Sequence, residues 1–224
     1  MTSNRNRGFG LAVIATPLLW LAAEALSPAL KSTSAGQLSA VAAHPDRWYW
    51  YTVLLIAGLI TLVPAAIGIA RLTAAGAPRL SAVGATLLGF SSIVAVGDAA
   101  TQLVTWQMVQ PGSDRAQMVA LLDRYDNSTA ASLLYLPGGL ALLVGAALLS
   151  LALWRTRVAP RWAAVSFGLG LAVNLFGFMS SSIPVIALGA AVMTPACLTL
   201  GARLIGSAAD TTSIAAGTPV PATV

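Results

Sequence analysis

The sequence predicts an all-α polytopic membrane protein. We expect a transmembrane helical bundle of about six spans, arranged as three hairpins, with short interfacial helices on the outer side. Of the 224 residues, 57% are hydrophobic and only 8% are charged, and the mean hydropathy is +0.81. Soluble domains carry roughly 25% charged residues. Apolar runs of about 20 residues, the length of a helix that crosses the hydrocarbon core, also recur along the chain.

The apolar runs divide the chain into one transmembrane domain over residues 1–206 and a tail over residues 207–224. The tail is rich in Ala, Thr and Pro, so we expect it to be disordered and cytoplasmic. Within the domain we predict six spans, at Phe9–Leu30, Trp48–Ile69, Leu80–Val109, Ala131–Trp154, Trp162–Ser180 and Pro184–Ile205.

The basic residues predict which end of the bundle faces the cytoplasm. If the N-terminus is inside, eight basic residues lie on the inner side and four on the outer side, and cytoplasmic loops carry an excess of Lys and Arg. We therefore expect a multi-pass protein of the cell membrane with both termini cytoplasmic. The basic residues are scattered between apolar spans, so the net charge of +5 does not indicate a nucleic-acid partner. The inner set is Arg5, Arg7, Arg71, Arg79, Arg155, Arg157, Arg161 and Arg203, and the outer set is Lys31, Arg47, Arg115 and Arg124.

Two segments of the outer loops have the pattern of short surface helices. These are Gln37–Ala43 and Asp114–Tyr125, with Ser113 as the expected N-cap of the second. The second segment has apolar residues at helical spacing, and an aromatic anchor, Trp48 to Tyr51, follows the first. Two interpretations are open. The helices are either a rim that sets the depth of the spans or a lid over a cavity that opens outward.

Two acidic residues, Glu24 and Asp98, lie inside apolar runs that contain no other charge, and both fall in the outer half of their spans. An ionisable group at this depth is costly and indicates a functional site. Asp98 shares a helix face with polar residues that include Gln102, and Trp20 lies one turn before Glu24. We therefore expect a pocket with two acids near its outer mouth. Its candidate binding residues are Trp20, Gln102, Trp106, Asn174, Phe176 and Phe178.

The two acids suggest a chemistry. Removal from water disfavours a charged carboxylate, so we expect one or both acids to be neutral near pH 7 and able to protonate an alkene or an epoxide. Aromatic faces could then stabilise the carbocation. Two structural explanations compete with this function. Asp98 could simply hydrogen-bond Gln102 or a neighbouring helix, and Ala23-Glu24-Ala25 imitates the cleavage site of a signal peptide.

The chain shows no pattern for a metal or a cofactor, and we expect none. Its single cysteine, Cys197, excludes an intrachain disulfide and a thiolate cluster, and its one histidine, His44, has no second histidine nearby.

A weak internal repeat carries one resemblance. Asp46-Arg47-Trp48 precedes a span that ends in the basic turn Ala77-Pro78-Arg79, and Asp123-Arg124-Tyr125 precedes one that ends in Ala159-Pro160-Arg161. With the six-span layout, these motifs resemble a group of small Ala- and Leu-rich bacterial membrane proteins. The likeness covers most of the chain but implies no activity.

The embedded acids carry a second resemblance, to the integral-membrane terpene cyclases of fungal meroterpenoid and bacterial prenylated-indole or diketopiperazine pathways. Those enzymes are similar in size and helix content and use membrane-buried Asp or Glu as acid catalysts, although the fungal ones have a seventh span. The matching positions here are Glu24 and Asp98. The resemblance implies an isomerase or lyase of terpenoid biosynthesis.

Together these observations predict a membrane enzyme for a hydrophobic small molecule, with acid-initiated cyclisation of a prenyl or terpenoid chain as the expected reaction. Asp98 would be the proton donor, and Glu24 a partner acid or the final base. The alternative is a non-catalytic membrane protein, either a proton-linked carrier or a structural or sensory subunit, that uses the acids for packing or assembly. A homo-oligomer is compatible with both.

Overall fold

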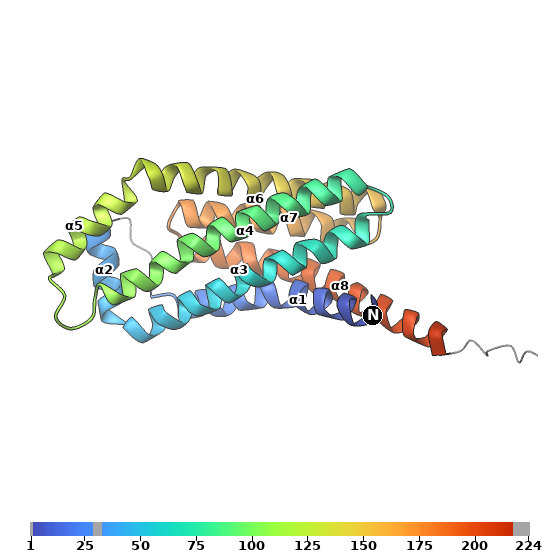
Figure 1. Cartoon of the computed structure of the whole chain (residues 1–224), viewed down its shortest axis with the longest axis horizontal. Coiled ribbons are helices and arrows are strands. Elements are labelled where there is room, and N and C mark those ends of the chain that lie inside the picture. Colours follow the sequence, from blue (N-terminus) through green and yellow to red (C-terminus); the bar gives the residue numbers. More distant parts are fainter. Residues whose placement is uncertain (1, 29–32, 217–224) are drawn as a thin grey trace, which may run out of the picture.

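The computed structural model describes residues 2–28 and 33–216, and this part of the chain is helical without any strand (Figure 1). The predicted polytopic helical bundle is therefore confirmed. In chain order the described helices are α1 (Thr2–Leu26), α2 (Ser34–Ala43), α3 (Pro45–Thr73), α4 (Pro78–Gln107), α5 (Arg115–Asp126), α6 (Thr129–Thr156), α7 (Arg161–Met179) and α8 (Ile183–Ala216).

Six of these helices are long and apolar enough to cross a membrane. They contain the spans Asn4–Leu26, Pro45–Thr73, Pro78–Gln107, Tyr135–Thr156, Arg161–Met179 and Ile183–Ser207. The predicted boundaries differ by a few residues at most ends. The first helix ends at Leu26, because Pro28 cannot continue it, and not at Leu30; residues 29–32 lie outside the described part.

The tail also differs from the prediction. α8 continues to Ala216, so the first part of the segment that we expected to be disordered is helical. The remainder, residues 217–224, lies outside the described part of the chain.

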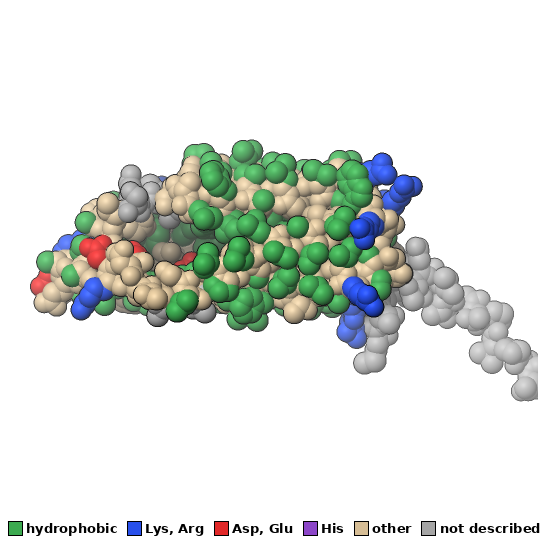
Figure 2. Space-filling view, turned by 90° about the horizontal axis from the view of Figure 1, so that it is seen from above, with side chains coloured by type: hydrophobic (Ala, Val, Ile, Leu, Met, Phe, Trp, Pro, Cys, Tyr) green, Lys and Arg blue, Asp and Glu red, His purple; other side chains and the backbone are tan. Residues whose placement is uncertain are grey.

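The six long helices form a closed ring in chain order. α1 packs on α3, α3 on α4, α4 on α6, α6 on α7, α7 on α8, and α8 returns to α1. The flank of this ring is apolar, with large exposed side chains such as Ile93 and Leu188 (Figure 2). In water such an apolar surface would promote aggregation, whereas in contact with lipid it is expected. The ring therefore belongs in a bilayer.

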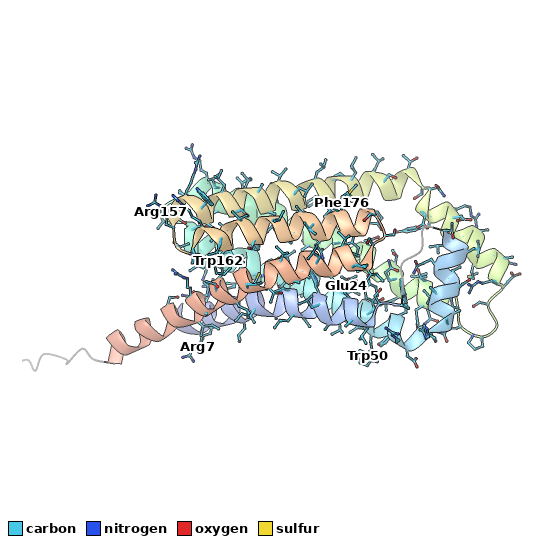
Figure 3. All side chains as sticks on the ribbon, turned by 180° about the vertical axis from the view of Figure 1, so that it is seen from behind. Arg7, Glu24, Trp50, Arg157, Trp162 and Phe176 are labelled. Atoms are coloured by element: carbon cyan, nitrogen blue, oxygen red, sulfur yellow. The ribbon has the colours of Figure 1, made fainter. Side chains whose placement is uncertain are left out.

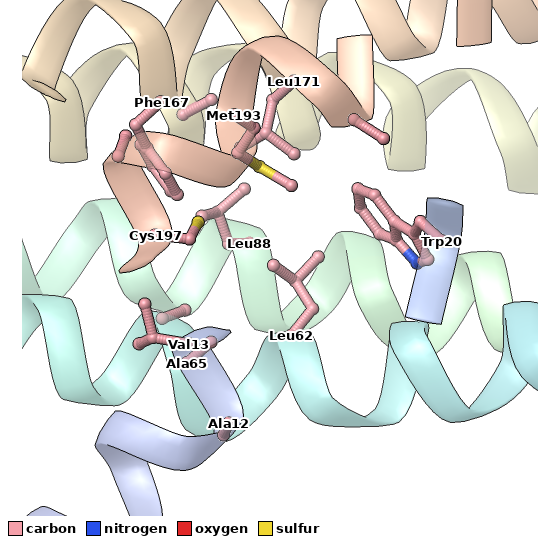
Figure 4. Packing of buried hydrophobic residues seen from close by; sticks show 14 of the residues in the cluster. Ala12, Val13, Trp20, Leu62, Ala65, Leu88, Phe167, Leu171, Met193 and Cys197 are labelled. Atoms are coloured by element: carbon pink, nitrogen blue, oxygen red, sulfur yellow. The ribbon is translucent and has the colours of Figure 1, made fainter. Parts of the chain in front are cut away.

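One end of the bundle, which we call the basic end, carries the N-terminus and the turns that join α3 to α4 and α6 to α7 (Figure 1). Arginine side chains gather there in the space-filling view (Figure 2). Toward this end the core is filled by buried side chains that include Leu88, Leu171, Met193 and Cys197 (Figure 4). Glycines let the helices approach closely: a Cβ at Gly145 would lie 2.9 Å from the backbone N of Leu88.

The opposite end is covered by α2 and α5, which we call the cap (Figure 1). Thr33 caps α2, and Asp114 caps α5 by accepting hydrogen bonds from the backbone N–H groups of Ala116 at 2.9 Å and Gln117 at 3.2 Å. Ser113 was therefore the wrong N-cap. The carboxylate of Asp114, one residue later, reaches the free N–H groups of the first turn.

Polar and apolar contacts hold the cap together. Arg115 of α5 donates a hydrogen bond from Nη2 to Oγ of Ser39 of α2, at 2.9 Å. Below these groups, Leu38, Met108 and Leu122 form a small apolar cluster between α2, α5 and the end of α4. The two short helices thus pack as one unit over the end of the ring.

Candidate functional site: two cavities that meet at Asp98

Two cavities occupy the half of the molecule nearer the cap. The bundle cavity, about 260 Å³, lies inside the ring between α1, α3, α4, α6 and α7. The cap cavity, about 370 Å³, lies between α2, α4 and α5. Figure 2 shows a hollow in this part of the surface, beside acidic side chains. Each volume is near the lower end of the range for small-molecule sites, roughly 300–1,000 Å³.

The bundle cavity has mostly apolar walls. Its aromatic lining residues are Trp20 of α1, Tyr135 of α6 and Phe178 of α7. The remaining lining residues are aliphatic or small, with a few polar groups: Leu55, Leu59, Leu62, Ser91, Ser92, Val94, Ala95, Asp98, Ala99, Gly138, Gly139, Leu142, Asn174 and Leu175.

The cap cavity is lined largely by polar side chains. Asp98, Thr101, Gln102 and Thr105 present one face of α4 to it, as the sequence spacing predicted for that face. The cap contributes the other polar groups. The rest of the lining is Thr33, Ser34, Gln37, Val104, Met108, Leu121, Leu122, Tyr125 and Asp126.

Asp98 lines both cavities. Its side chain is exposed, although the residue lies well inside a membrane-spanning helix. Because the residue borders two hollows, part of this exposure faces the two cavities. The hydroxyl of Tyr135 lies within hydrogen-bonding range of the Asp98 carboxyl group, and it also hydrogen-bonds the hydroxyl of Tyr125 on the cap.

Glu24 has different surroundings. It lies toward the cap end of α1, far from Arg7 at the other end of the helix (Figure 3). Its side chain is only 6% exposed, it lines neither cavity, and both carboxyl oxygens lack a hydrogen-bond partner among the described residues. Tyr51 of α3 is close enough to interact electrostatically with both Glu24 and Asp98. The two acids thus share a neighbour but not a cavity.

The other candidate residues separate into two groups. Trp20, Asn174 and Phe178 line the bundle cavity and Gln102 lines the cap cavity; Asn174 also donates from Nδ2 to the carbonyl oxygen of Ile186 at 3.0 Å. Trp106 and Phe176 line neither. Trp106 packs against Tyr49, with ring centroids 5.4 Å apart, and Phe176 is 64% exposed on the flank.

Sequence reasoning missed Tyr135, which approaches Asp98 from another helix. No charge or motif marks this residue inside its apolar run, so only the packing of α6 against α4 shows its position. Tyr125 was assigned to the end of a surface helix and Asp126 lay just beyond it, so neither was assigned to a site. The sequence did contain one signal for Tyr125, because this residue is the last of the apolar residues at helical spacing in the segment Asp114–Tyr125.

Asp126 is the acid of the cap cavity that lies outside the membrane-spanning segments. Partial burial raises the pKa of its carboxyl group above the ordinary value, and the charge of Asp123 acts in the same direction. A hydrogen bond from Oγ of Ser34 to Oδ2, at 3.4 Å, opposes this rise. The residue thus links α2 to α5 and responds to pH.

Within residues 2–28 and 33–216, no three His, Cys, Asp or Glu side chains are grouped so that they could hold a metal ion. Protein-family models, curated proteins and solved structures were compared with the chain, and none of them matches it.

Proposed function

We propose that this chain is an integral membrane enzyme that acts on a lipid-soluble substrate, with acid-initiated cyclisation of a prenyl or terpenoid chain as its reaction. The observation that carries the proposal is that Asp98 borders both the apolar bundle cavity and the polar cap cavity. A hydrocarbon chain fits the first space, while the second gives the carboxyl group a polar side at which its proton exchanges with water. A general acid must lie within reach of its substrate and be protonated before each turnover.

In this proposal the Asp98 carboxyl group gives its proton to an alkene carbon, and the π bond breaks to leave a carbocation. A second alkene of the same chain attacks the cation and closes a ring. A neighbouring C–H bond then loses its proton to the Asp98 carboxylate, which restores the acid. The product is an isomer of the substrate, so no oxidant or reductant is consumed.

Two groups of side chains support the chemistry. Trp20, Tyr135 and Phe178 offer aromatic rings to the bundle cavity, and an aromatic face attracts a cation by about 0.5–2 kcal/mol. The hydrogen-bonding contact with Tyr135 positions the Asp98 carboxyl group. Because Glu24 lines neither cavity, Asp98 serves as both acid and final base, and Glu24 is not required to touch the substrate.

One observation favours the alternative, a proton-linked carrier. Glu24 is buried with both oxygens unpartnered among the described residues, and isolated acids in membrane helices mark proton relays. In a carrier, substrate uptake into vesicles would depend on a proton gradient and would be lost in Glu24→Gln. In the enzyme, Glu24→Gln would still form product.

The test uses purified protein in lipid nanodiscs, incubated in D₂O with farnesol, geranylgeraniol and their aryl ethers. We expect an isomeric cyclic product carrying one deuterium from the exchanged carboxyl group. Asp98→Asn keeps the shape of the side chain but holds no acidic proton, so the rate should fall by about 10²–10⁴-fold. Asp46→Asn, a change at an exposed acid in the first turn of α3, is the control. Equal product from the Asp98→Asn variant would refute the mechanism.

The orientation in the membrane is also part of the proposal. The N-terminus lies at the basic end together with the arginines of two interhelical turns, and Lys and Arg favour the cytoplasmic side. We therefore assign the basic end to the cytoplasm of the cell, with the cap and both cavities toward the outer face.

A further inference from the structure

The bundle cavity has a weak wall where α6 meets α7. These two helices make the fewest contacts of the six neighbouring pairs in the ring. Their outer halves supply seven of the lining residues of the bundle cavity, namely Tyr135, Gly138, Gly139 and Leu142 of α6 and Asn174, Leu175 and Phe178 of α7. The wall between cavity and lipid is therefore formed by the loosest contact in the ring.

α6 and α7 are separated only in the half of this wall nearer the cap. A Cβ added at Gly139 would have no neighbour closer than the methyl groups of Leu175, at 4.0 Å. Nearer the basic end the same two helices touch: a Cβ at Gly168 would lie 3.2 Å from the Cβ of Ser150. The two helices thus meet tightly at one end and separate beside the cavity.

At this level α6 lies closer to α4 than to α7. A Cβ at Gly138 would lie only 2.7 Å from a methyl group of Val94 on α4, so the face toward α4 is full while the adjacent face toward α7 has room. The local sequence also weakens the helix. Pro137 has no N–H for the carbonyl oxygen one turn earlier, and the two glycines that follow have low helix propensity. This stretch of α6 is therefore a locally weakened part of the helix.

The outer surface of both half-helices is apolar. Leu133 and Leu136 of α6 are 72% and 67% exposed, and Phe176 and Met179 of α7 are 64% and 78% exposed (Figure 3). A molecule that leaves the acyl chains at this level therefore meets no charged group before it reaches the cavity. The cap route differs, because Asp98 and Asp126 line it together with hydroxyl and amide groups.

We propose that the separated half of the α6–α7 contact is a lateral portal through which an apolar ligand passes directly between the bilayer and the bundle cavity. The ligand class is a membrane-partitioned hydrocarbon chain, with the cap cavity left for its polar end and for water. This inference takes from the proposed function only the assignment of the bundle cavity as the binding site. It concerns the route by which a ligand reaches that cavity.

A portal controls rates, whereas the cavity walls control affinity. Because Gly139 and Leu175 also line the bundle cavity, each cross-linked protein is compared with the same double-cysteine protein after reduction, which cancels the effect of the substitutions themselves. In this comparison, cross-linking the portal should slow association and dissociation by the same factor and leave the dissociation constant of the double-cysteine protein almost unchanged. The locked variant carries Gly139→Cys and Leu175→Cys, joined by a short bis-methanethiosulfonate. The control carries Ser150→Cys and Gly168→Cys, which join the same two helices where they already touch. Cys197 is buried and should not react.

The probe is 1-bromododecane added to protein in lipid nanodiscs. Bromine quenches tryptophan on contact, and Trp20 lines the bundle cavity, so the signal is the quenching that Trp20→Phe removes. We expect the portal lock to slow this quenching at least tenfold, with recovery after reduction, and the control lock to leave it unchanged. If both locked proteins bind at the unlocked rate, or if the portal lock changes the dissociation constant alone, the portal is refuted. Neither result bears on the effect of Asp98→Asn on product formation.

Discussion

Tyr125 of the cap and Tyr135 of the bundle hydrogen-bond each other through their hydroxyl groups, and Tyr135 also lies within hydrogen-bonding range of Asp98. The pair connects α5, which covers the end of the ring, to the acid at the junction of the two cavities. Tyr125 lines the cap cavity and Tyr135 the bundle cavity. The position of the cap and the orientation of the central acid are therefore coupled through two side chains.

The coupling can be measured by removing the hydroxyl groups. Tyr125→Phe and Tyr135→Phe should each lower the free energy of unfolding by about 0.5–1.5 kcal/mol, the usual net value of one hydrogen bond. Combined, they should cost less than their sum, because each already breaks the shared bond. Thermal unfolding in detergent provides the measurement, with Tyr49→Phe, an exposed tyrosine, as the control. Strict additivity would contradict a direct bond.

Two glycines of α6 should respond oppositely to alanine. A Cβ at Gly145 would lie 2.9 Å from the backbone N of Leu88 and 3.0 Å from the carbonyl oxygen of Gly84, and backbone atoms cannot yield as side chains do. Gly145→Ala should destabilise the bundle by about 1–3 kcal/mol through overpacking.

Gly139→Ala is the matched change. Its new methyl group would have nothing closer than 4.0 Å, and alanine favours the helix by up to about 1 kcal/mol. We therefore expect unchanged or increased stability in the same unfolding measurement. Equal losses at both positions would show that α6 and α7 are as close beside the cavity as α4 and α6 are elsewhere.

The cap should depend on pH through Asp126. Because partial burial raises the pKa of this carboxyl group above the ordinary value of 3.8, its contribution to stability is fully present below that value and is lost as pH rises through the pKa of the folded state. Asp126→Asn removes the ionisation. The variant should therefore gain in unfolding temperature relative to the native chain as pH rises, and a difference that stays constant across a pH series would argue against this cause.

The bundle could be predicted because hydrocarbon imposes a simple rule on sequence. A span needs about 20 apolar residues, and loops keep their charges, so six spans and two surface helices follow from composition. Their order around the ring does not follow. It depends on close approaches such as that of Gly84 and Gly145, which only the packed structure identifies among many glycines.

The candidate site was predictable only in part. Asp98, Gln102 and Trp20 could be selected because a charge, an amide or an indole is conspicuous in an apolar run. Phe176 was selected by closeness in sequence to Asn174, yet residues two apart on a helix of about 3.6 residues per turn point to nearly opposite sides. Phe178, one turn after Asn174, lines the same cavity, as helical spacing would indicate.

The orientation of the bundle can be tested with single cysteines, because the native Cys197 is only 3% exposed and should not react with a membrane-impermeant maleimide. Ser113→Cys lies in the exposed turn before α5, at the cap end, and Ala75→Cys lies in the exposed turn between α3 and α4, at the basic end. Since arginines flank the second turn, we expect it to be cytoplasmic. Intact cells should then be labelled at position 113, and position 75 should react only after permeabilisation. The reverse pattern would place both cavities toward the cytoplasm and would mean that the arginine excess does not set the orientation of this bundle.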